Sequence, residues 1–364
     1  MAPQPSRRKI LYVGSLGAGH TSLHRFDALA RLGQEMVPFA LEPHEPQSRY
    51  VAALQYRLPV GPLIRKVNEA LQAAIAEHRP DVVWFDKPVL FHAGTLEAAK
   101  RAGAQTVCYL LDNPFGPRHD GNWMQFLKVY KLFDLHCLVR SVDVGRYSGW
   151  GLPFVKIMLS YDPQTHFPPA PGWGDADRRR ELAYTGSPLE KRAAFLQSLG
   201  EACGLPLSVA GPRWEKAWPP ELLQKYVVGG MMKDAAYRAS LWTSKINLAF
   251  MTRMNEEDVA HKAFEITACA QFLLAERSPG HQACFEEGRE AEFFGSLEEC
   301  ADKARFYLAH PAEREAIAAA GRARSLRSGY DNDAQLARVL DRLDGVGPES
   351  SAEGAAAHDE GGRA

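Results

Sequence analysis

Short apolar runs that alternate with longer amphipathic segments constrain this chain's fold more than any other feature. The first apolar run covers 10–14, and a segment whose apolar residues have helical spacing follows over 20–33. The same alternation continues through the first half of the chain and resumes near residue 181. Strands that are separated by helices form parallel sheets covered on both faces. The sequence therefore predicts an α/β protein with two consecutive doubly wound domains.

The predicted strands are short and rich in aliphatic and aromatic residues. They lie at 10–14, 36–40, 81–85, 105–111, 135–139, 154–158, 182–186, 206–210, 245–250 and 272–274. The predicted helices are longer and carry apolar residues three and four positions apart. They lie at 20–33, 60–78, 93–102, 190–200, 231–241, 259–269, 296–309, 311–326 and 333–344.

A change in composition divides the chain. The stretch "YDPQTHFPPAPGWGDADRRR", at about 161–180, is rich in Pro, Gly and charge, which is typical of a linker. We therefore predict an N-terminal domain over 1–160 and a C-terminal domain over 181–344. The closing stretch, 345–364, has the low hydrophobicity of a disordered tail.

Composition excludes several classes of protein. The chain has 364 residues, 46% of them hydrophobic, which is enough for two large cores. Its formal net charge of -1 gives no global basic field for nucleic acid or an anionic membrane, although basic residues can still gather at one site. Its six cysteines form no C-x-x-C pair, and His281-x-x-Cys284 alone is a weak metal signal. We expect a cytoplasmic protein without a membrane span, a metal site or a nucleic-acid partner.

The first predicted strand runs into the glycine-rich sequence "GSLGAGH" at 14–20. Gly17 and Gly19 permit positive φ and let a ligand approach the start of the next helix. The spacing is not the dinucleotide fingerprint G-x-G-x-x-G, and a plain tight turn explains it equally well. His20 either contacts a substrate hydroxyl or faces solvent.

Acidic residues follow two other strands of the first half. Asp112 comes at the end of the strand predicted over 105–111. Its carboxylate either faces a ligand or caps the turn that precedes Pro114. Asp86 follows the strand over 81–85 and has the same two interpretations.

Glycine turns also follow two consecutive strands of the second half. Gly186 and Ser187 come after the first, with Arg192 at the start of the next helix. Gly211 comes after the second, with Arg213 close behind. Exposed backbone N–H groups together with a nearby guanidinium are typical of an anion site.

The helix predicted over 259–269 starts with charged residues. Lys262 and Glu265 lie one turn apart, and Glu257 lies just before the helix. Two carboxylates and a cation at a helix start suit a nucleotide-sugar: the carboxylates accept the hydroxyls, and the cation binds the diphosphate. The alternative is an ordinary helix start with an ion pair three residues apart, and spacing alone favours it.

An ordered series of segments adds a family resemblance over about 181–340. The segments "ELAYTGSPLEKRAAFLQSL", "PLSVAGPRW", "SKINLAF", "HKAFEITACAQFLLAE" and "SGYDNDAQLARVL" resemble the CgeB-type (spore-maturation-like) glycosyltransferases. These are relatives of glycosyltransferase family 4. The resemblance implies a GT-B fold, with two Rossmann-like domains facing a central cleft. It also implies transfer of a sugar from a nucleotide-diphosphate-sugar donor to an unidentified glycan, protein or small molecule.

The resemblance also implies roles for individual residues. Gly186, Ser187 and Arg192 correspond to positions near the donor diphosphate. Glu265 corresponds to a ribose-binding glutamate, and Glu257 to one near the transferred sugar. The resulting catalytic candidates are Glu257, Lys262, His20 and Asp112. The resulting donor-binding candidates are Gly186, Ser187, Arg192, Gly211, Lys262, Glu265, Gly17 and Gly19.

The implied chemistry is retaining transfer in which electrostatic stabilisation dominates, without a protein nucleophile, metal or further cofactor. The chain departs from the family at three positions. Lys262 replaces an arginine, Ala270 replaces a glycine, and Asn113 replaces an aspartate. These departures leave two alternatives open. One is a non-catalytic nucleotide-sugar-binding or scaffold protein, and the other is a GT-B sugar-nucleotide epimerase.

Overall fold

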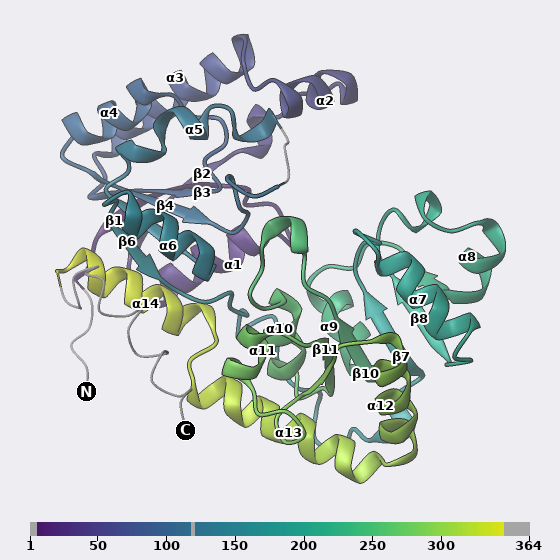
Figure 1. The fold of residues 1–364 in the computed structure, drawn as a ribbon. Coiled ribbons are helices and arrows are strands. Elements are labelled where there is room, and N and C mark those ends of the chain that lie inside the picture. The colour runs from purple at the N-terminus through teal and green to yellow at the C-terminus, as the bar shows by residue number, and fades with distance from the viewer. Residues whose placement is uncertain (1–5, 118–120, 346–364) are drawn as a thin grey trace. The chain divides into compact units, whose positions relative to one another are not determined.

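The computed structural model describes residues 6–117 and 121–345 (Figure 1). The described chain forms two compact units, each with its own parallel sheet. The first unit comprises Met1–Met158, Met254–Glu256 and Asp333–Ala364, and the second comprises Leu159–Arg253 and Glu257–Asn332. The predicted tail lies outside the described residues, apart from Gly345.

The sheet of the first unit has six strands, all paired in parallel, in the order β2-β1-β3-β4-β5-β6. The strand order reverses between β1 and β3, which are hydrogen-bonded neighbours. The strands are β1 (Lys9–Gly14), β2 (Glu35–Ala40), β3 (Val82–Asp86), β4 (Gln105–Leu110), β5 (Leu135–Leu138) and β6 (Phe154–Lys156).

The first unit contains both predicted and unpredicted helices. Helices α1, α3, α4 and α14 were predicted from the sequence, whereas α2, α5 and α6 were not. The helices are α1 (Thr21–Arg31), α2 (Arg49–Arg57), α3 (Pro62–His78), α4 (Ala93–Arg101), α5 (Phe126–Val129), α6 (Ser141–Gly149) and α14 (Asn332–Leu343). In α3, Pro62 occupies the first turn and left-handed Arg79 ends the helix, while Val67 and Leu71 enter the core.

Helix α14 departs from the domain boundaries expected from sequence, which placed it in the second domain. In the structure, the chain from Asp333 onward groups with the first unit. Arg31 Nε donates to Asp333 Oδ2 over 2.9 Å, and the Gln335 side chain accepts from the Met158 N–H over 2.9 Å. These contacts join residues about 300 and 180 positions apart, which periodicity along the chain does not reveal.

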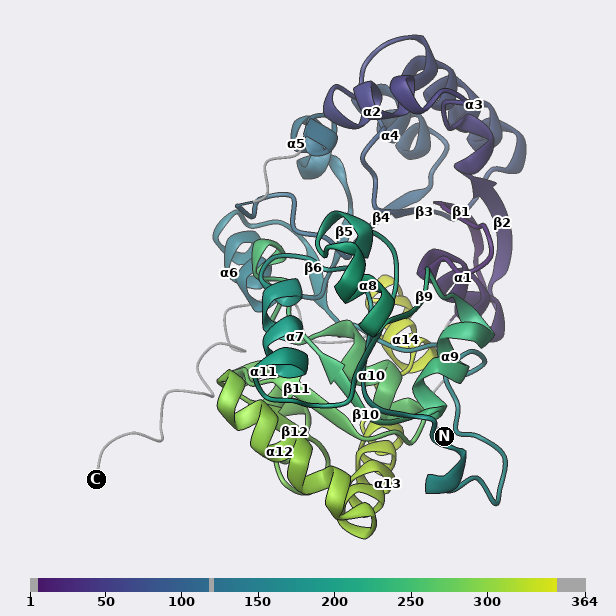
Figure 2. The same cartoon turned by 90° about the vertical axis from the view of Figure 1, so that its right-hand side faces the viewer.

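The sheet of the second unit has the order β12-β11-β10-β7-β8-β9, with its reversal between β7 and β10. Its strands are β7 (Arg180–Thr185), β8 (Leu207–Ala210), β9 (Val227–Gly229), β10 (Ser244–Ala249), β11 (Leu273–Glu276) and β12 (Glu292–Phe294). Its helices are α7 (Arg192–Glu201), α8 (Pro220–Tyr226), α9 (Asp234–Trp242), α10 (His261–Ala268), α11 (Pro279–Cys284), α12 (Leu297–Ala309) and α13 (Pro311–Arg327). Helix α10 packs against β10 and β11 (Figure 2).

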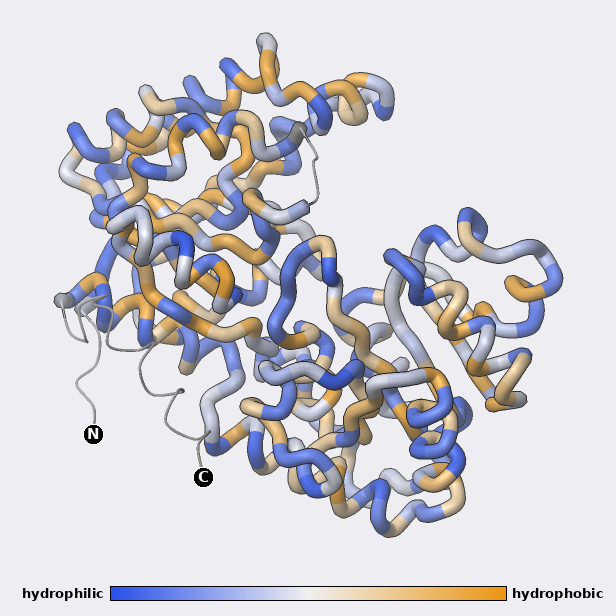
Figure 3. Tube along the Cα trace, viewed as in Figure 1, coloured by the Kyte–Doolittle hydropathy of each residue, from blue (hydrophilic) through white to orange (hydrophobic). Residues whose placement is uncertain are grey.

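The two sheets confirm the predicted pair of doubly wound α/β folds. Much of the hydrophobic colour in Figure 3 lies along the strands, as expected for parallel sheets covered on both faces. The predicted linker, however, is not a free connection. Tyr161 forms a parallel bridge with Asp331, and His166 is 3% exposed, so the start of this segment packs into the second unit, while most of 167–180 is exposed or half-buried.

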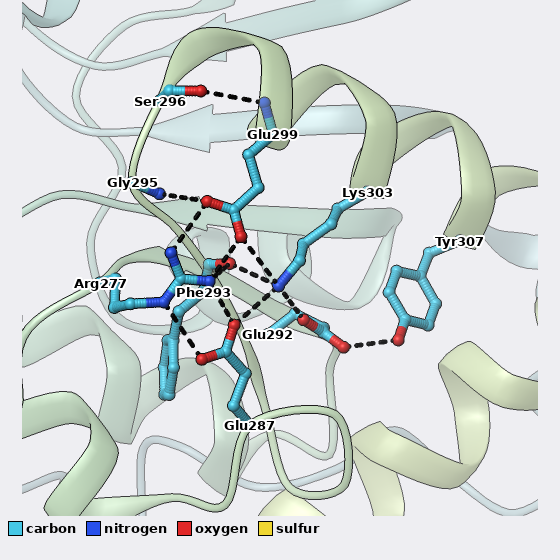
Figure 4. A network of polar contacts seen from close by, with 9 residues as sticks. All are labelled: Arg277, Glu287, Glu292, Phe293, Gly295, Ser296, Glu299, Lys303 and Tyr307. Carbon is cyan, nitrogen blue, oxygen red and sulfur yellow. Dashed lines mark hydrogen bonds and ion pairs between the residues drawn. The ribbon is translucent and has the colours of Figure 1, made fainter.

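A network of charged residues fixes the end of β11 to α12 (Figure 4). Arg277 donates to Glu287 over 3.1 Å and to Glu299 over 2.8 Å. Lys303 of α12 donates to Glu287 over 2.7 Å and to Glu292 of β12 over 2.6 Å. The hydrogen bond from Arg277 lowers the pKa of Glu299 to about 2. The network therefore holds the far edge of the second sheet in place.

The first unit contains a buried ion pair where β3 ends. Arg25 of α1 donates from Nε to Asp86 Oδ2 over 2.7 Å, and both side chains are almost fully buried. The Tyr12 hydroxyl donates to the same oxygen over 2.6 Å, and the Arg25 guanidinium stacks 4.5 Å from the centre of the Tyr109 ring. Asp86 is therefore a structural residue, and neither interpretation offered by the sequence describes it.

Removing one member of this pair should destabilise the protein strongly. In Arg25→Met, Asp86 would keep only the Tyr12 donor for a buried charge, which typically costs about 3–5 kcal/mol. We expect the melting temperature, followed by circular dichroism, to fall by about 6–15 °C.

The control is Arg101→Met, because Arg101 forms an exposed pair with Glu97 four residues earlier. Such pairs contribute about 0.5 kcal/mol, so its melting temperature should change by no more than about 2 °C. Equal effects of the two substitutions would show that the buried pair does not stabilise the first unit.

Candidate functional site

The predicted residues of the second unit gather at the carboxyl ends of β7, β8 and β10. Gly186 follows β7, Gly211 follows β8, and the chain after β10 leads to α10 with Lys262 and Glu265. The strand order reverses between β7 and β10, so these turns lie at the position where doubly wound sheets bind ligands.

Two of these turns touch through their backbones. The Gly186 N–H donates to Ala210 O over 2.7 Å. A Cβ on Gly211 would lie 2.2 Å from the Gly186 carbonyl oxygen, and Gly211 has φ +139°. Trp214 Nε1 also donates to that oxygen over 3.0 Å. Only glycine fits at 211, so packing alone accounts for this residue.

Gly186 lies beside the side chain of Lys262. A Cβ on Gly186 would lie 2.6 Å from the Tyr184 hydroxyl oxygen and 3.3 Å from Lys262 Cε. The carbonyl of Ser187 accepts from the Tyr184 hydroxyl over 3.1 Å and from the Leu189 N–H over 2.9 Å. The turn is thus shaped from inside by Tyr184 and is bordered on one side by a lysine.

Lys262 is a cation without a carboxylate partner. Its Nζ lies 4.8 Å from the centre of the Tyr237 ring, which is cation–π distance. Within the described ranges, no carboxylate lies within 4.0 Å of this nitrogen. Burial lowers the pKa of Lys262, Glu265 raises it in part, and Arg192 lowers it further. The ion pair three residues apart, which spacing favoured, is therefore not formed.

Glu265 is instead held by two residues from other segments and by His261 of its own helix. The Tyr237 hydroxyl donates to Oε2 over 2.7 Å. His166 Nε2 and His261 Nε2 lie 3.8 and 3.9 Å from Oε1. Burial raises the pKa of Glu265, but His261, His166, Lys262 and the Tyr237 hydrogen bond outweigh it and lower this pKa to about 2. The carboxylate is therefore ionised and fixed in orientation.

Arg192 lies at the start of α7, as the sequence predicted, but its guanidinium points into protein. Its terminal nitrogens donate to the Tyr184 hydroxyl over 3.1 Å, to Met251 O over 3.0 Å and to Thr252 Oγ1 over 2.9 Å. Only Nε is buried without a partner. Arg192 thus fixes the chain after β10, and diphosphate binding by this residue stays a prediction.

Glu257 closes the loop between β10 and α10. Its Oε2 accepts from the Thr252 N–H over 2.8 Å, and the carboxylate contributes to the raised pKa of Tyr184, which burial raises most. Tyr184 also touches Gly186 and Arg192, so these predicted residues belong to one cluster. We name Gly186, Ser187, Arg192, Gly211, Glu257, Lys262 and Glu265 the donor cluster, after the role that the sequence predicted for them.

The glycine turn of the first unit is occupied by a protein carboxylate. Glu42 Oε1 accepts from the Gly17 N–H over 2.6 Å, and its Oε2 is buried without a partner. Gly19 has φ +75°, which a turn explains. His20 is exposed and starts α1 without capping it. Both interpretations of Gly17, Gly19 and His20 therefore remain, but the turn already carries a negative charge.

Asp112 forms an ion pair with Lys87, the residue after β3. The turn before Pro114 is closed by Asn113, whose side-chain oxygen accepts from the Phe115 N–H over 2.9 Å. The capping interpretation of Asp112 is therefore wrong, because the neighbouring residue, Asn113, caps this turn. Asp112 and His20 follow β4 and β1, which β3 separates in the sheet.

The groups that hold Glu265 were not predicted from the sequence. His261 precedes it by four residues, so helical spacing contained a signal. His166 and Tyr237 lie far away in the sequence, and no local pattern identifies them. His281 is structural: Ser278 contacts its Nδ1, and its Nε2 accepts from the Ala260 N–H over 3.1 Å. In the described part of the chain, no three His, Cys, Asp or Glu residues form a metal-binding group.

Residues 190–341 match a family described as glycosyl transferase-like. No curated protein matches the chain in sequence. Among solved structures, Anabaena HepE in complex with UDP-glucose superposes with a TM-score of 0.65 at 15% identity, covering 93% of this chain and 100% of the other. Sucrose-phosphate synthase from Thermosynechococcus elongatus superposes with a TM-score of 0.64 at 15% identity, and the same shares of the two chains are covered. A glycosyltransferase from Rickettsia africae superposes with a TM-score of 0.64 at 14% identity, covering 93% of this chain and 98% of the other.

The fold is that of the GT-B glycosyltransferases. The GT-B expectation from sequence is thereby confirmed, and most of the glycosyl transferase-like match, residues 190–341, falls on the second unit, which contains the donor cluster. At these identities the superpositions establish the fold alone.

The ionised state of Glu265 gives a pH-dependent contribution to stability. A pKa held near 2 in the folded state, against about 4.3 unfolded, corresponds to about 3 kcal/mol. A depressed carboxyl pKa stabilises the fold above the unfolded value, and this contribution is lost as pH falls towards 2. In urea unfolding, the stability difference between wild type and Glu265→Gln should therefore be largest near pH 5 and shrink towards pH 2.

Tyr237→Phe is the companion variant, because it keeps the carboxylate and removes its hydrogen-bond donor. Its stability difference from wild type should also shrink towards acid pH, from a smaller starting value. A difference that stays constant between pH 5 and pH 2 in both variants would contradict the assigned ionisation.

Proposed function

We propose that this protein is a glycosyltransferase that takes its sugar from a nucleotide-diphosphate-sugar bound at the donor cluster. The observation that carries the proposal is the arrangement of Lys262, a cation without a carboxylate partner, beside the backbone turn at Gly186. Solved relatives in fold include complexes with UDP and UDP-glucose, which supports a uridine-containing donor.

The proposed binding mode assigns each part of the donor to one group. The diphosphate lies at the turn of Gly186 and Ser187, where Lys262 neutralises it in place of the arginine of related sequences. Glu265, ionised and held by Tyr237, accepts hydrogen bonds from the ribose hydroxyls. Glu257 lies towards the transferred sugar.

The proposed reaction is transfer with retention, without metal and without a further cofactor. The bond between the anomeric carbon and the diphosphate breaks, and the acceptor hydroxyl oxygen attacks the same face of the sugar. The proton of that hydroxyl moves to the departing phosphate oxygen. The Lys262 charge stabilises the diphosphate as negative charge accumulates on it.

His20 and Asp112, in the first unit, are proposed to act on the acceptor side. We also propose that the protein is located in the cytoplasm.

Substitution of Lys262 should weaken donor binding directly. Lys262→Met keeps the length of the side chain and removes its charge, and a charged hydrogen bond contributes about 1.5–3 kcal/mol. We expect the Kd for UDP-glucose, measured by calorimetry, to rise about 10- to 100-fold. If another nucleotide is preferred, the same loss should appear with GDP- or dTDP-sugars.

The matched control is Lys225→Met, since Lys225 is an exposed lysine of the same unit that pairs with Glu201. It should bind the donor as wild type does. Lys262→Met removes a partly buried cation that lacks a carboxylate within 4.0 Å but helps to keep Glu265 ionised, so its melting temperature should stay within about 2 °C of wild type. Equal binding by all three proteins, or binding by none, would contradict the donor site. Donor binding followed by epimer formation without an acceptor would identify an epimerase instead.

A further inference from the structure

Helix α2 is an amphipathic helix that the protein does not bury. None of the nine residues of Arg49–Arg57 is buried. Tyr50 is 71% exposed, Leu54 63% and Val51 43%. An isolated helix of this length is marginal in water, and helices in proteins are stabilised mainly by packing of an apolar face. The described chain provides no such packing for this face of α2.

The exposed apolar residues lie together on the helix. Tyr50, Leu54 and Leu58 are four residues apart, and Val51 lies beside them, so one stripe runs along the helix axis. Leu58, directly after the helix, is 44% exposed. Both Figure 1 and Figure 2 place α2 at the periphery of the first unit, beside α3.

Both charged residues of α2 are basic. Arg49 and Arg57 lie at the two ends of the helix, and Lys66 follows in α3, where Arg65 pairs with Glu69 over 3.6 Å. No aspartate or glutamate occurs from 46 to 68, although the whole chain has a formal net charge of -1. Arg49 and Arg57 thus border the exposed apolar stripe in a stretch without acidic residues.

We propose that α2 docks on the surface of an anionic lipid bilayer. Tyr50, Leu54 and Val51 enter the boundary between headgroups and acyl chains, and Arg49 and Arg57 contact the lipid phosphates. Apolar side chains on one face together with basic residues at its borders characterise helices that lie in this interface. The contact is with the surface, since no helix in the described ranges is long and apolar enough to span a membrane.

The charge pattern favours a bilayer over a second copy of the chain. In a symmetric dimer through α2, the same surface of each copy would meet, and Arg49 and Arg57 of both copies would be brought together. Like charges at such a contact are destabilising, whereas lipid phosphates neutralise them. The proposal uses no residue of the donor cluster and stands independently of the proposed function.

The first test is co-sedimentation of the full chain with vesicles. Binding to phosphatidylcholine vesicles that contain phosphatidylglycerol should exceed binding to pure phosphatidylcholine, and added salt should weaken it. Equal binding to both kinds of vesicle, or binding to neither, would overturn the proposal.

Two double variants separate the apolar and the electrostatic contributions. Tyr50→Ser/Leu54→Gln removes apolar contact and should weaken binding to anionic vesicles at least tenfold. Arg49→Gln/Arg57→Gln should weaken it about 30-fold, because each basic residue near an anionic surface contributes about 1 kcal/mol. The matched controls are Leu326→Gln, which replaces a 54% exposed leucine of α13, and Arg101→Gln on α4. Both controls should bind as wild type does.

The variants are expected to fold, because α2 buries none of its residues. Their melting temperatures should stay within about 2 °C of wild type. If Tyr50→Ser/Leu54→Gln binds vesicles as tightly as wild type, the helix does not enter the bilayer and the proposal is wrong. If wild type is a dimer by light scattering and this variant is a monomer, α2 is covered by a second copy, which also overturns it.

Discussion

The parallel pairing of β7 with β10 is the constraint on which the donor cluster depends. Strand order in the second sheet reverses at this pair, so the loops after the two strands leave towards opposite sides of the sheet. The turn at Gly186 and the chain leading to α10 therefore border the same space at the carboxyl edge. Gly211 has no Cβ, which lets the turn after β8 pack against Gly186 at backbone distance.

The glycine turns of the two units differ in the charge of the side chains beside them. In the first unit, Glu42 accepts from Gly17, so a protein carboxylate already satisfies the turn. In the second unit, the turn at Gly186 lies beside Lys262, whose ammonium group contacts the Tyr237 ring and has no carboxylate within 4.0 Å. An anionic ligand would be repelled at the first turn and attracted at the second. This asymmetry supports placing the donor in the second unit.

Periodicity along the sequence was sufficient to predict the architecture, because strands and helices of a doubly wound sheet are local patterns. It placed Gly186 at a strand end and Lys262 and Glu265 at a helix start, while the family resemblance implied that these residues bind the donor. The partners of Glu265 were not predictable in the same way. His166 lies in a stretch whose proline and glycine content resembles a linker, yet it is buried beside Glu265. A high proline and glycine content indicates that a segment lacks helices and strands, but it does not show whether the segment packs against the rest of the protein.

The central claim is that the donor binds at the second unit's strand ends, and hydrogen exchange with mass spectrometry tests it most directly. Addition of UDP should slow amide exchange in 186–189 and in the segment from 257 to the first turn of α10. Exchange in 14–20 of the first unit should not change. Protection confined to 14–20, or none in either unit at UDP concentrations that saturate binding, would contradict the account.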